Sequence, residues 1–189
     1  MINIARIART AAAAAAALTA VAVAGAPAAQ AAPVHAAGFS TVQSCTSVSG
    51  KITYGKGLTK TVKTHHSVLT GTVAGCTGLN GAQSGTGTIS GALVGKSSYK
   101  SVNETGTVTV NWPAGSGFNP SNAAVTLRET SKNGVITIGG TITSGAFTGA
   151  RFSTSLLPVS HKGSGSKAHP LKSQTLVNTE PLVVSRNLG

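Results

Sequence analysis

Short runs of alternating apolar and polar residues recur from residue 47 onward, and they constrain the fold more than any other feature of the chain. Thr107-Val108-Thr109-Val110 is the clearest of these runs. A period of two gives one apolar face only when the chain is a β-strand. Eight strands are expected, at residues 47–54, 67–74, 85–94, 99–112, 123–129, 135–143, 146–155 and 175–184.

The connections between these runs are rich in Gly and Asn, which favour turns. Lys132-Asn133-Gly134 joins two of them, and Asn-Gly between alternating runs is a strong hairpin signal. No window after the N-terminal segment has the apolar stripe of a helix. The sequence therefore predicts an all-β protein, an antiparallel β-sandwich or β-barrel of about eight strands.

The N-terminal segment has the pattern of an export signal. Arg6 and Arg9 precede an apolar run at residues 10–25, and Ala29-Gln30-Ala31 fits a signal-peptidase site. The alternative is an uncleaved membrane anchor, but the run is shorter than the roughly 20 residues that a spanning helix needs. We expect residues 1–31 to be a signal peptide cleaved after Ala31, and the remaining chain to be secreted and extracellular. Its net charge would fall from +12 to +10 with the loss of the two arginines.

The remaining chain has the length of one domain, and its composition divides it into three parts. Residues 32–44 are Ala-rich and are expected to be a flexible lead-in, and residues 45–157 hold most of the alternating runs. Residues 158–189 begin with a Gly/Ser/Lys-rich stretch, which predicts a loop followed by a terminal strand or a tail.

Cys45 and Cys76 are the only cysteines of the chain. An even pair in an exported protein predicts one disulfide. Their spacing is far wider than the C-x-x-C of redox proteins, so a structural role is favoured over a redox pair or half of a metal site.

Acidic residues are scarce, which excludes several kinds of site. The chain has three, all glutamates (Glu104, Glu129 and Glu180), and no aspartate. Calcium loops of the EF-hand type, aspartic dyads and Asp-rich magnesium sites need carboxylates that it lacks. We predict no cofactor and no metal site.

Lysines are the most informative polar residues. A first group lies in one short stretch, and a second lies in the Gly/Ser-rich stretch. The predicted binding residues are Lys51, Lys56, Lys60 and Lys63 in the first group and Lys162, Lys167 and Lys172 in the second. They indicate contact with anionic polymers such as teichoic acid, acidic polysaccharide or extracellular DNA. The alternative is a solvated basic surface that only maintains solubility.

Catalytic motifs are not evident, and we expect a non-catalytic protein. Glu104 and Glu129 are expected to face solvent, and no G-x-S-x-G is present. One alternative is a small secreted hydrolase that uses His65 or His66 with a serine and a glutamate. Adjacent histidines on a strand point to opposite faces, so these two are unsuited to sharing a metal ion.

Two further features bear on function. A secreted inhibitor that presents Lys56 or Lys60 on a rigid loop is a second alternative. Trp112 stands at the end of a predicted strand, where it is either an exposed stacking ring or part of the core, and the core is favoured.

A Gly-Thr-hydrophobic motif recurs at residues 71–73, 87–89, 106–108 and 140–142. The spacing is too irregular for a solenoid. The motif predicts that each Thr faces solvent and each Val or Ile faces the core.

An ordered series of motifs supports a resemblance. It consists of Cys45 with Gly50, Gly71 to Cys76, Gly106 to Trp112, and Thr143 to Gly149. Over residues 45–157 the chain resembles a group of small secreted β-rich proteins of actinobacteria, generally uncharacterised. Such proteins often carry further cysteines, which this chain lacks. The resemblance implies export and an all-β fold, and it implies no catalytic residue.

Overall fold

The computed structural model describes residues 38–130 and 134–187. Within them the chain forms nine strands and one short 3-10 helix. Their bounds are β1 Phe39–Leu58, β2 Lys63–Gly78, β3 Gly81–Ser98, β4 Ser101–Asn111, η1 Ala114–Ser116, β5 Ser121–Thr130, β6 Val135–Ser144, β7 Arg151–Lys162, β8 Leu171–Asn178 and β9 Leu182–Asn187. The predicted signal peptide, residues 1–31, lies outside the described residues.

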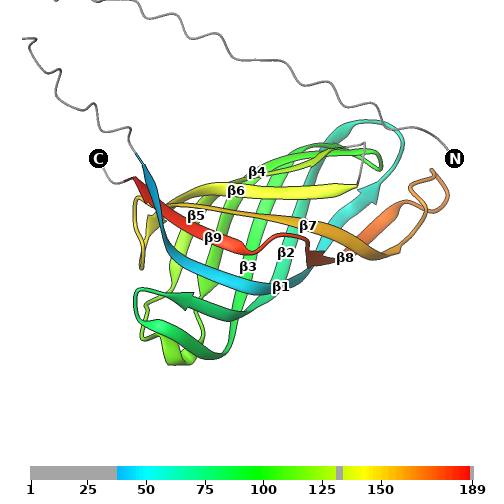
Figure 1. Cartoon of the computed structure of the whole chain (residues 1–189). Helices are drawn as coiled ribbons and strands as arrows, with labels where there is room; N and C mark the ends of the chain where they lie inside the picture. Colours follow the sequence, from blue (N-terminus) through cyan, green and yellow to red (C-terminus); the bar gives the residue numbers. More distant parts are fainter. Residues whose placement is uncertain (1–37, 131–133, 188–189) are drawn as a thin grey trace, which may run out of the picture. The chain divides into compact units, whose positions relative to one another are not determined.

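The strands form one closed antiparallel barrel (Figure 1). β1 to β8 pair in sequence order, and β8 pairs back onto β1. β8 and β9 share one position in the barrel, because both pair with β1 and β7. β8 pairs with the second half of β1, from Ser49 to Leu58, and β9 pairs with the first half, from Phe39 to Cys45. The all-β prediction is confirmed, and the structure selects the barrel.

Each expected strand overlaps an observed one, but several limits differ, and the run expected at 146–155 becomes a strand only from Arg151 because residues 146–149 form a turn. The lead-in expected at 32–44 ends sooner, since β1 begins at Phe39. The loop expected from residue 158 starts only after Lys162, because β7 continues to that residue. The final run at 175–184 is two strands, separated by residues 179–181. Residue 181 is a proline, which has no N–H to donate to a strand ladder.

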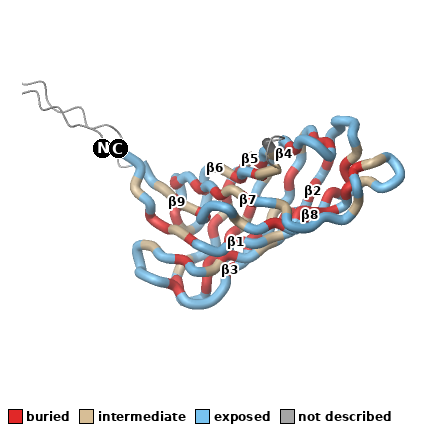
Figure 2. The backbone as a smooth tube through the Cα atoms, turned by 45° about the vertical axis from the view of Figure 1, so that its right-hand side comes forward, coloured by how far each residue is buried: buried red, intermediate tan, exposed pale blue. Residues whose placement is uncertain are grey.

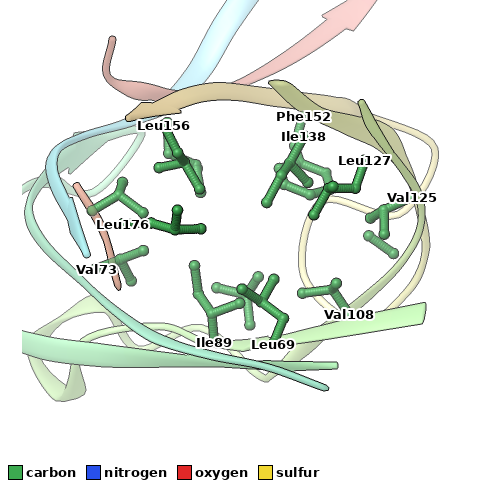
Figure 3. Close-up of a cluster of buried hydrophobic side chains, with 14 of the residues drawn as sticks. Leu69, Val73, Ile89, Val108, Val125, Leu127, Ile138, Phe152, Leu156 and Leu176 are labelled. Atoms are coloured by element: carbon green, nitrogen blue, oxygen red, sulfur yellow. The ribbon is translucent and has the colours of Figure 1, made fainter. Parts of the chain in front are cut away.

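Burial alternates along the strands (Figure 2), and most of the buried side chains are apolar. Inward-pointing side chains from opposite walls meet in the middle of the barrel (Figure 3). The labelled ones include Leu69, Val108, Ile138, Phe152 and Leu176. The interior is thus a packed core, as expected for eight strands.

The Gly-Thr-hydrophobic motif behaves as predicted. Thr72, Thr88, Thr107 and Thr141 are exposed, and Val73, Ile89, Val108 and Ile142 are buried. The glycines have a role that the sequence did not reveal. A Cβ on Gly106 would collide with the carbonyl oxygen of Ala92 on β3, and one on Gly140 with that of Ala124 on β5. These glycines let neighbouring backbones approach closely in a narrow barrel.

Cys45 on β1 and Cys76 on β2 are register partners and form a disulfide. Both residues are buried. The predicted bridge is confirmed, and it joins two strands that already pair.

Candidate functional site

The two ends of the barrel differ in chemistry. At one end β1, β3, β5 and β7 finish and β2, β4, β6 and β8 begin. We call it the lysine end, because all the described lysines except Lys51 lie in its loops or in the strand residues next to them. These are Lys56, Lys60, Lys63, Lys96, Lys100, Lys162, Lys167 and Lys172, and all are exposed. Positive charge is therefore concentrated on one end of the molecule.

The structure brings the two predicted lysine groups together. The connection between β1 and β2, residues 59–62, lies beside the connection between β7 and β8, residues 163–170 (Figure 1). Lys60 from the first connection, Lys63 at the start of β2 and Lys167 from the second connection line one hollow of about 480 Å³. Thr59, Thr61 and Ser166 complete its walls. We call this hollow the lysine hollow.

Two more predicted lysines lie beside each other where β1 pairs with β8. Lys172 donates a hydrogen bond from Nζ to the backbone oxygen of Lys56 at 3.4 Å. Lys162 is the last residue of β7 and the register partner of Ser173. Lys51 is separate, because it pairs with Thr70 and Thr175 in the middle of the barrel wall.

The loops that carry these lysines are held by their own hydrogen bonds. The Tyr99 N–H donates to the carbonyl oxygen of Thr59 at 2.8 Å, which ties the β3–β4 turn to the β1–β2 loop. In the β7–β8 loop, the Ser164 N–H donates to the His169 oxygen at 3.0 Å, and the His169 N–H donates to Ser166 Oγ at 2.9 Å. Gly165 lies so close to the Tyr99 ring that it leaves no room for a Cβ.

A second hollow, of about 440 Å³, opens at the same end. We call it the mouth pocket. Its polar lining comprises Glu129, His161, Ser164 and Gln174, and its apolar lining comprises Tyr99, Leu157, Pro158 and Leu171. The β7–β8 loop borders both hollows, since Gly163 and Ser164 line the mouth pocket and Ser166 and Lys167 line the lysine hollow.

Buried polar groups occupy the barrel next to the mouth pocket. The Tyr54 hydroxyl donates to Gln174 Oε1 at 2.6 Å, and both side chains are buried. Burial raises the pKa of Tyr54 above its ordinary value, and the carboxylates of Glu129 and Glu104 raise it further. Tyr54 is therefore a neutral donor. Burial also raises the pKa of Glu129.

The expectation that Glu104 and Glu129 face solvent is wrong. Glu104 is fully buried, and its Oε1 accepts hydrogen bonds from Ser67 Oγ at 3.0 Å and from Ser97 Oγ at 2.8 Å. Its Oε2 has no hydrogen-bond partner among the described residues. Glu129 is half-buried and lines the mouth pocket. Both lie on the inward phase of their strands, as Val102 and Leu127 do.

His65 and His66 point to opposite faces, as predicted. His65 is buried and its Nε2 has no partner among the described residues, while His66 is exposed. His65 and Glu104 flank Gly95 in one row across β2, β3 and β4. The serines nearby donate to Glu104 and are themselves buried, so this arrangement does not form the Ser–His pair of a nucleophilic site.

The alternative of a secreted inhibitor requires a lysine on a loop, and Lys56 does not meet this requirement because it lies within strand β1. Lys60 is in the short β1–β2 loop and is exposed.

Within residues 38–130 and 134–187, no three His, Cys, Asp or Glu side chains are grouped so that they could hold a metal ion. No helix in that part of the chain is long and apolar enough to cross a membrane.

The opposite end of the barrel is closed by aromatic rings. Trp112 is buried and packs edge-to-face on Phe147, with ring centroids 5.3 Å apart, and Phe118 packs on the same ring at 4.7 Å. Trp112 Nε1 donates to Ser121 Oγ at 2.9 Å. The favoured interpretation of Trp112 as a core residue is confirmed. A hollow of about 320 Å³ at this end has one charged residue, Arg151, in its lining, whereas the two larger hollows with several polar and charged residues lie at the lysine end.

Comparison of the chain with protein-family models, with curated proteins and with solved structures finds no match. The functional inference therefore depends on the geometry and charge of the barrel itself.

Proposed function

We propose that the protein is a secreted, non-catalytic module that binds anionic polymers at the lysine end of the barrel. The observation that carries this proposal is the lysine hollow. Lys60 and Lys63 precede Lys167 by about a hundred residues in sequence, yet the three line one concave surface. Lys56 and Lys172 extend the positive charge along the adjoining strands. Teichoic acid, acidic polysaccharide and extracellular DNA are the polymers that this charge suits.

The distribution of charge favours binding over solubility alone. A solubilising surface works best with charges dispersed over the molecule, whereas clustered charge of one sign attracts oppositely charged ligands. Here the acids nearest the lysines, Glu104 and Glu129, are withdrawn from the outer surface. At this end the eight exposed lysines therefore outnumber the one partly exposed carboxylate, that of Glu129 in the mouth pocket.

Secretion is the other half of the proposal. Residues 1–31 have the sequence pattern of a cleaved export signal. The Cys45–Cys76 disulfide is consistent with it, because such bridges persist in oxidising compartments. Sequencing the N-terminus of the protein from culture supernatant should begin at Ala32. Recovery of an intact N-terminus from the membrane fraction would contradict secretion.

The binding proposal is tested by retention on immobilised acidic polysaccharide, on isolated Gram-positive cell wall and on DNA across a salt gradient. The test variant replaces Lys60, Lys63 and Lys167 with Gln. The control replaces Lys51, Arg151 and Arg186 with Gln, which removes the same charge from exposed sites away from the lysine end.

We expect the protein to be retained at low salt and released as salt rises, because the screening length falls from about 10 Å at 0.1 M to about 3 Å at 1 M. The test variant should elute at clearly lower salt than the control. Equal elution of the two variants, or no retention of the unmodified protein, would show that the charge serves solubility only.

A further inference from the structure

The mouth pocket is not explained by attraction of anions. Glu129 lines it, and a carboxylate there repels an anionic group. Its volume of about 440 Å³ falls within the roughly 300–1,000 Å³ typical of small-molecule sites, which often lie in the mouths of β-barrels. Its ligand should therefore be uncharged where it enters the pocket.

The polar groups of the mouth pocket are suited to hydroxyl groups. Glu129 accepts hydrogen bonds, and the Ser164 hydroxyl and the His161 ring supply groups that donate or accept. Gln174 is fixed by the Tyr54 hydroxyl on its carbonyl oxygen, which leaves its amide NH₂ to donate. Such a mixture of fixed donors and acceptors fits a ligand that both donates and accepts at several positions.

The apolar groups of the mouth pocket add a surface for a ring. Tyr99, Leu157, Pro158 and Leu171 form this part of the lining. A sugar ring presents C–H groups on its faces and hydroxyls at its edge, so it can use both kinds of lining. Tyr99 is the only aromatic side chain there, which is too few for the successive base stacking that single-stranded nucleic acids use.

The mouth pocket and the lysine hollow are neighbours across the β7–β8 loop. Ser164 lines the first and Ser166 lines the second, with Gly165 between them packed on Tyr99. A ligand that crosses this loop could place an uncharged part in one hollow and an anionic group in the other.

We propose that the mouth pocket binds a sugar unit of an acidic polysaccharide whose anionic groups lie on Lys60, Lys63 and Lys167. This inference rests on the proposed function, and it selects polysaccharide among the anionic polymers. Glu129, His161 and Gln174 bind the hydroxyls, and Tyr99 supports the ring. The lysines supply most of the attraction and its salt dependence, and the mouth pocket supplies the selectivity for sugar.

The test measures binding of the purified protein to three probes of equal charge by titration calorimetry. Oligogalacturonate carries both sugar rings and carboxylates, inorganic polyphosphate carries charge without rings, and single-stranded DNA represents nucleic acid. We expect oligogalacturonate to bind about tenfold more tightly than polyphosphate, the gain that a few hydrogen bonds supply. Equal binding of the two, or tighter binding of DNA, would overturn the sugar pocket.

The variant Glu129→Gln separates hydrogen bonding from electrostatics. Removing a negative charge at the lysine end should strengthen binding of every polyanion if charge alone acts. If Glu129 accepts sugar hydroxyls, the substitution should weaken oligogalacturonate binding about fivefold and leave polyphosphate binding unchanged or slightly stronger. Glu180→Gln is the matched control, since it removes the same charge from an exposed residue outside the mouth pocket.

His161→Ala is a second pocket variant, for use if Glu129→Gln fails to fold. His161 is exposed, so its replacement should leave the fold intact. It should also weaken oligogalacturonate binding selectively, whereas His66→Ala, an exposed residue on the barrel wall, should not. If both pocket variants bind oligogalacturonate as the unmodified protein does while the triple Lys→Gln variant loses binding, this inference alone is overturned. If the triple Lys→Gln variant also binds as the unmodified protein does, the proposed function is overturned as well.

Discussion

The hydroxyl of Tyr54 donates a hydrogen bond of 2.6 Å to Oε1 of Gln174, a residue 120 positions further along the chain. The two side chains come from β1 and β8, which pair where the barrel closes. The same bond holds Gln174 in the lining of the mouth pocket. One buried contact therefore connects closure of the barrel to the geometry of the candidate site.

Replacing Tyr54 with Phe should lower the free energy of unfolding by about 1–3 kcal/mol, because Gln174 would keep a buried oxygen without its donor. Tyr99→Phe is the matched control, since the Tyr99 side chain is partly exposed at 38%. It should change stability by less than about 0.5 kcal/mol. Urea unfolding measures both, and equal effects would contradict a special role for the Tyr54 hydroxyl.

Loss of Glu104 should destabilise the protein, because the two serine hydroxyls that donate to it are buried. Glu104→Leu leaves the Ser67 and Ser97 hydroxyls buried without their acceptor, and we expect a cost of about 2–4 kcal/mol. Adding Ser67→Ala and Ser97→Ala to that variant should recover part of the loss, since it removes the unpaired groups. Chemical unfolding of the single and triple variants checks this, and strictly additive losses would contradict it.

The position of Glu104 also shows what the sequence could have revealed. The sequence offsets between Glu104 and its neighbours Val102, Val108 and Val110 are all even numbers. Strict alternation therefore puts the glutamate on the same face as these valines. Glu129 follows Leu127 in the same way on β5. The strands were predictable because alternation is local. The prediction that both acids face solvent assigned the alternation the opposite phase, which the buried Val102 and Leu127 contradict.

The meeting of the lysine groups was not predictable from sequence. Lys60 and Lys167 become neighbours only because β8 pairs with the second half of β1, which depends on the register of the barrel. Register between strands distant in sequence depends on packing of the whole core. The mouth pocket was missed for the same reason, since Glu129, His161 and Gln174 lie on three different strands.

Glu129 should make stability depend on pH. Because burial raises its pKa in the folded state, the folded protein favours the protonated form. The contribution of Glu129 to stability is therefore fully present below its unfolded pKa of about 4.3, and it is lost as pH rises through the folded pKa. Glu129→Gln mimics the protonated form, so its advantage over the unmodified protein should grow from pH 4 toward neutral pH.

The measurement compares thermal midpoints of the two proteins in steps of pH. It is repeated in a His161→Ala background, because the imidazole of His161 lines the same pocket. Tyr54 interacts electrostatically with Glu129 and stays neutral over this range, because burial raises its pKa. A difference between the two midpoints that does not change with pH would contradict the raised pKa of Glu129.

Gly165 should be essential to the candidate site and of little importance to the barrel. Its φ of +74° lies in the left-handed region, and a Cβ would collide with the Tyr99 ring. Gly165→Ala should therefore displace the β7–β8 loop from Tyr99 and disturb both hollows that the loop borders. Gly117→Ala is the matched control, because Gly117 has a similar φ of +68° but open space around its Cβ.

Both glycine substitutions carry the backbone cost of a positive φ, about 1–2 kcal/mol, so both should lower the thermal midpoint by a few degrees. Only Gly165→Ala should also reduce retention on acidic polysaccharide, by severalfold at fixed salt. The reason is that Lys167 and Ser164 lie on the loop that it moves, whereas Gly117 lies at the aromatic end. If both variants are retained as strongly as the unmodified protein, the shape of the β7–β8 loop does not matter for binding, and free lysine side chains alone account for it.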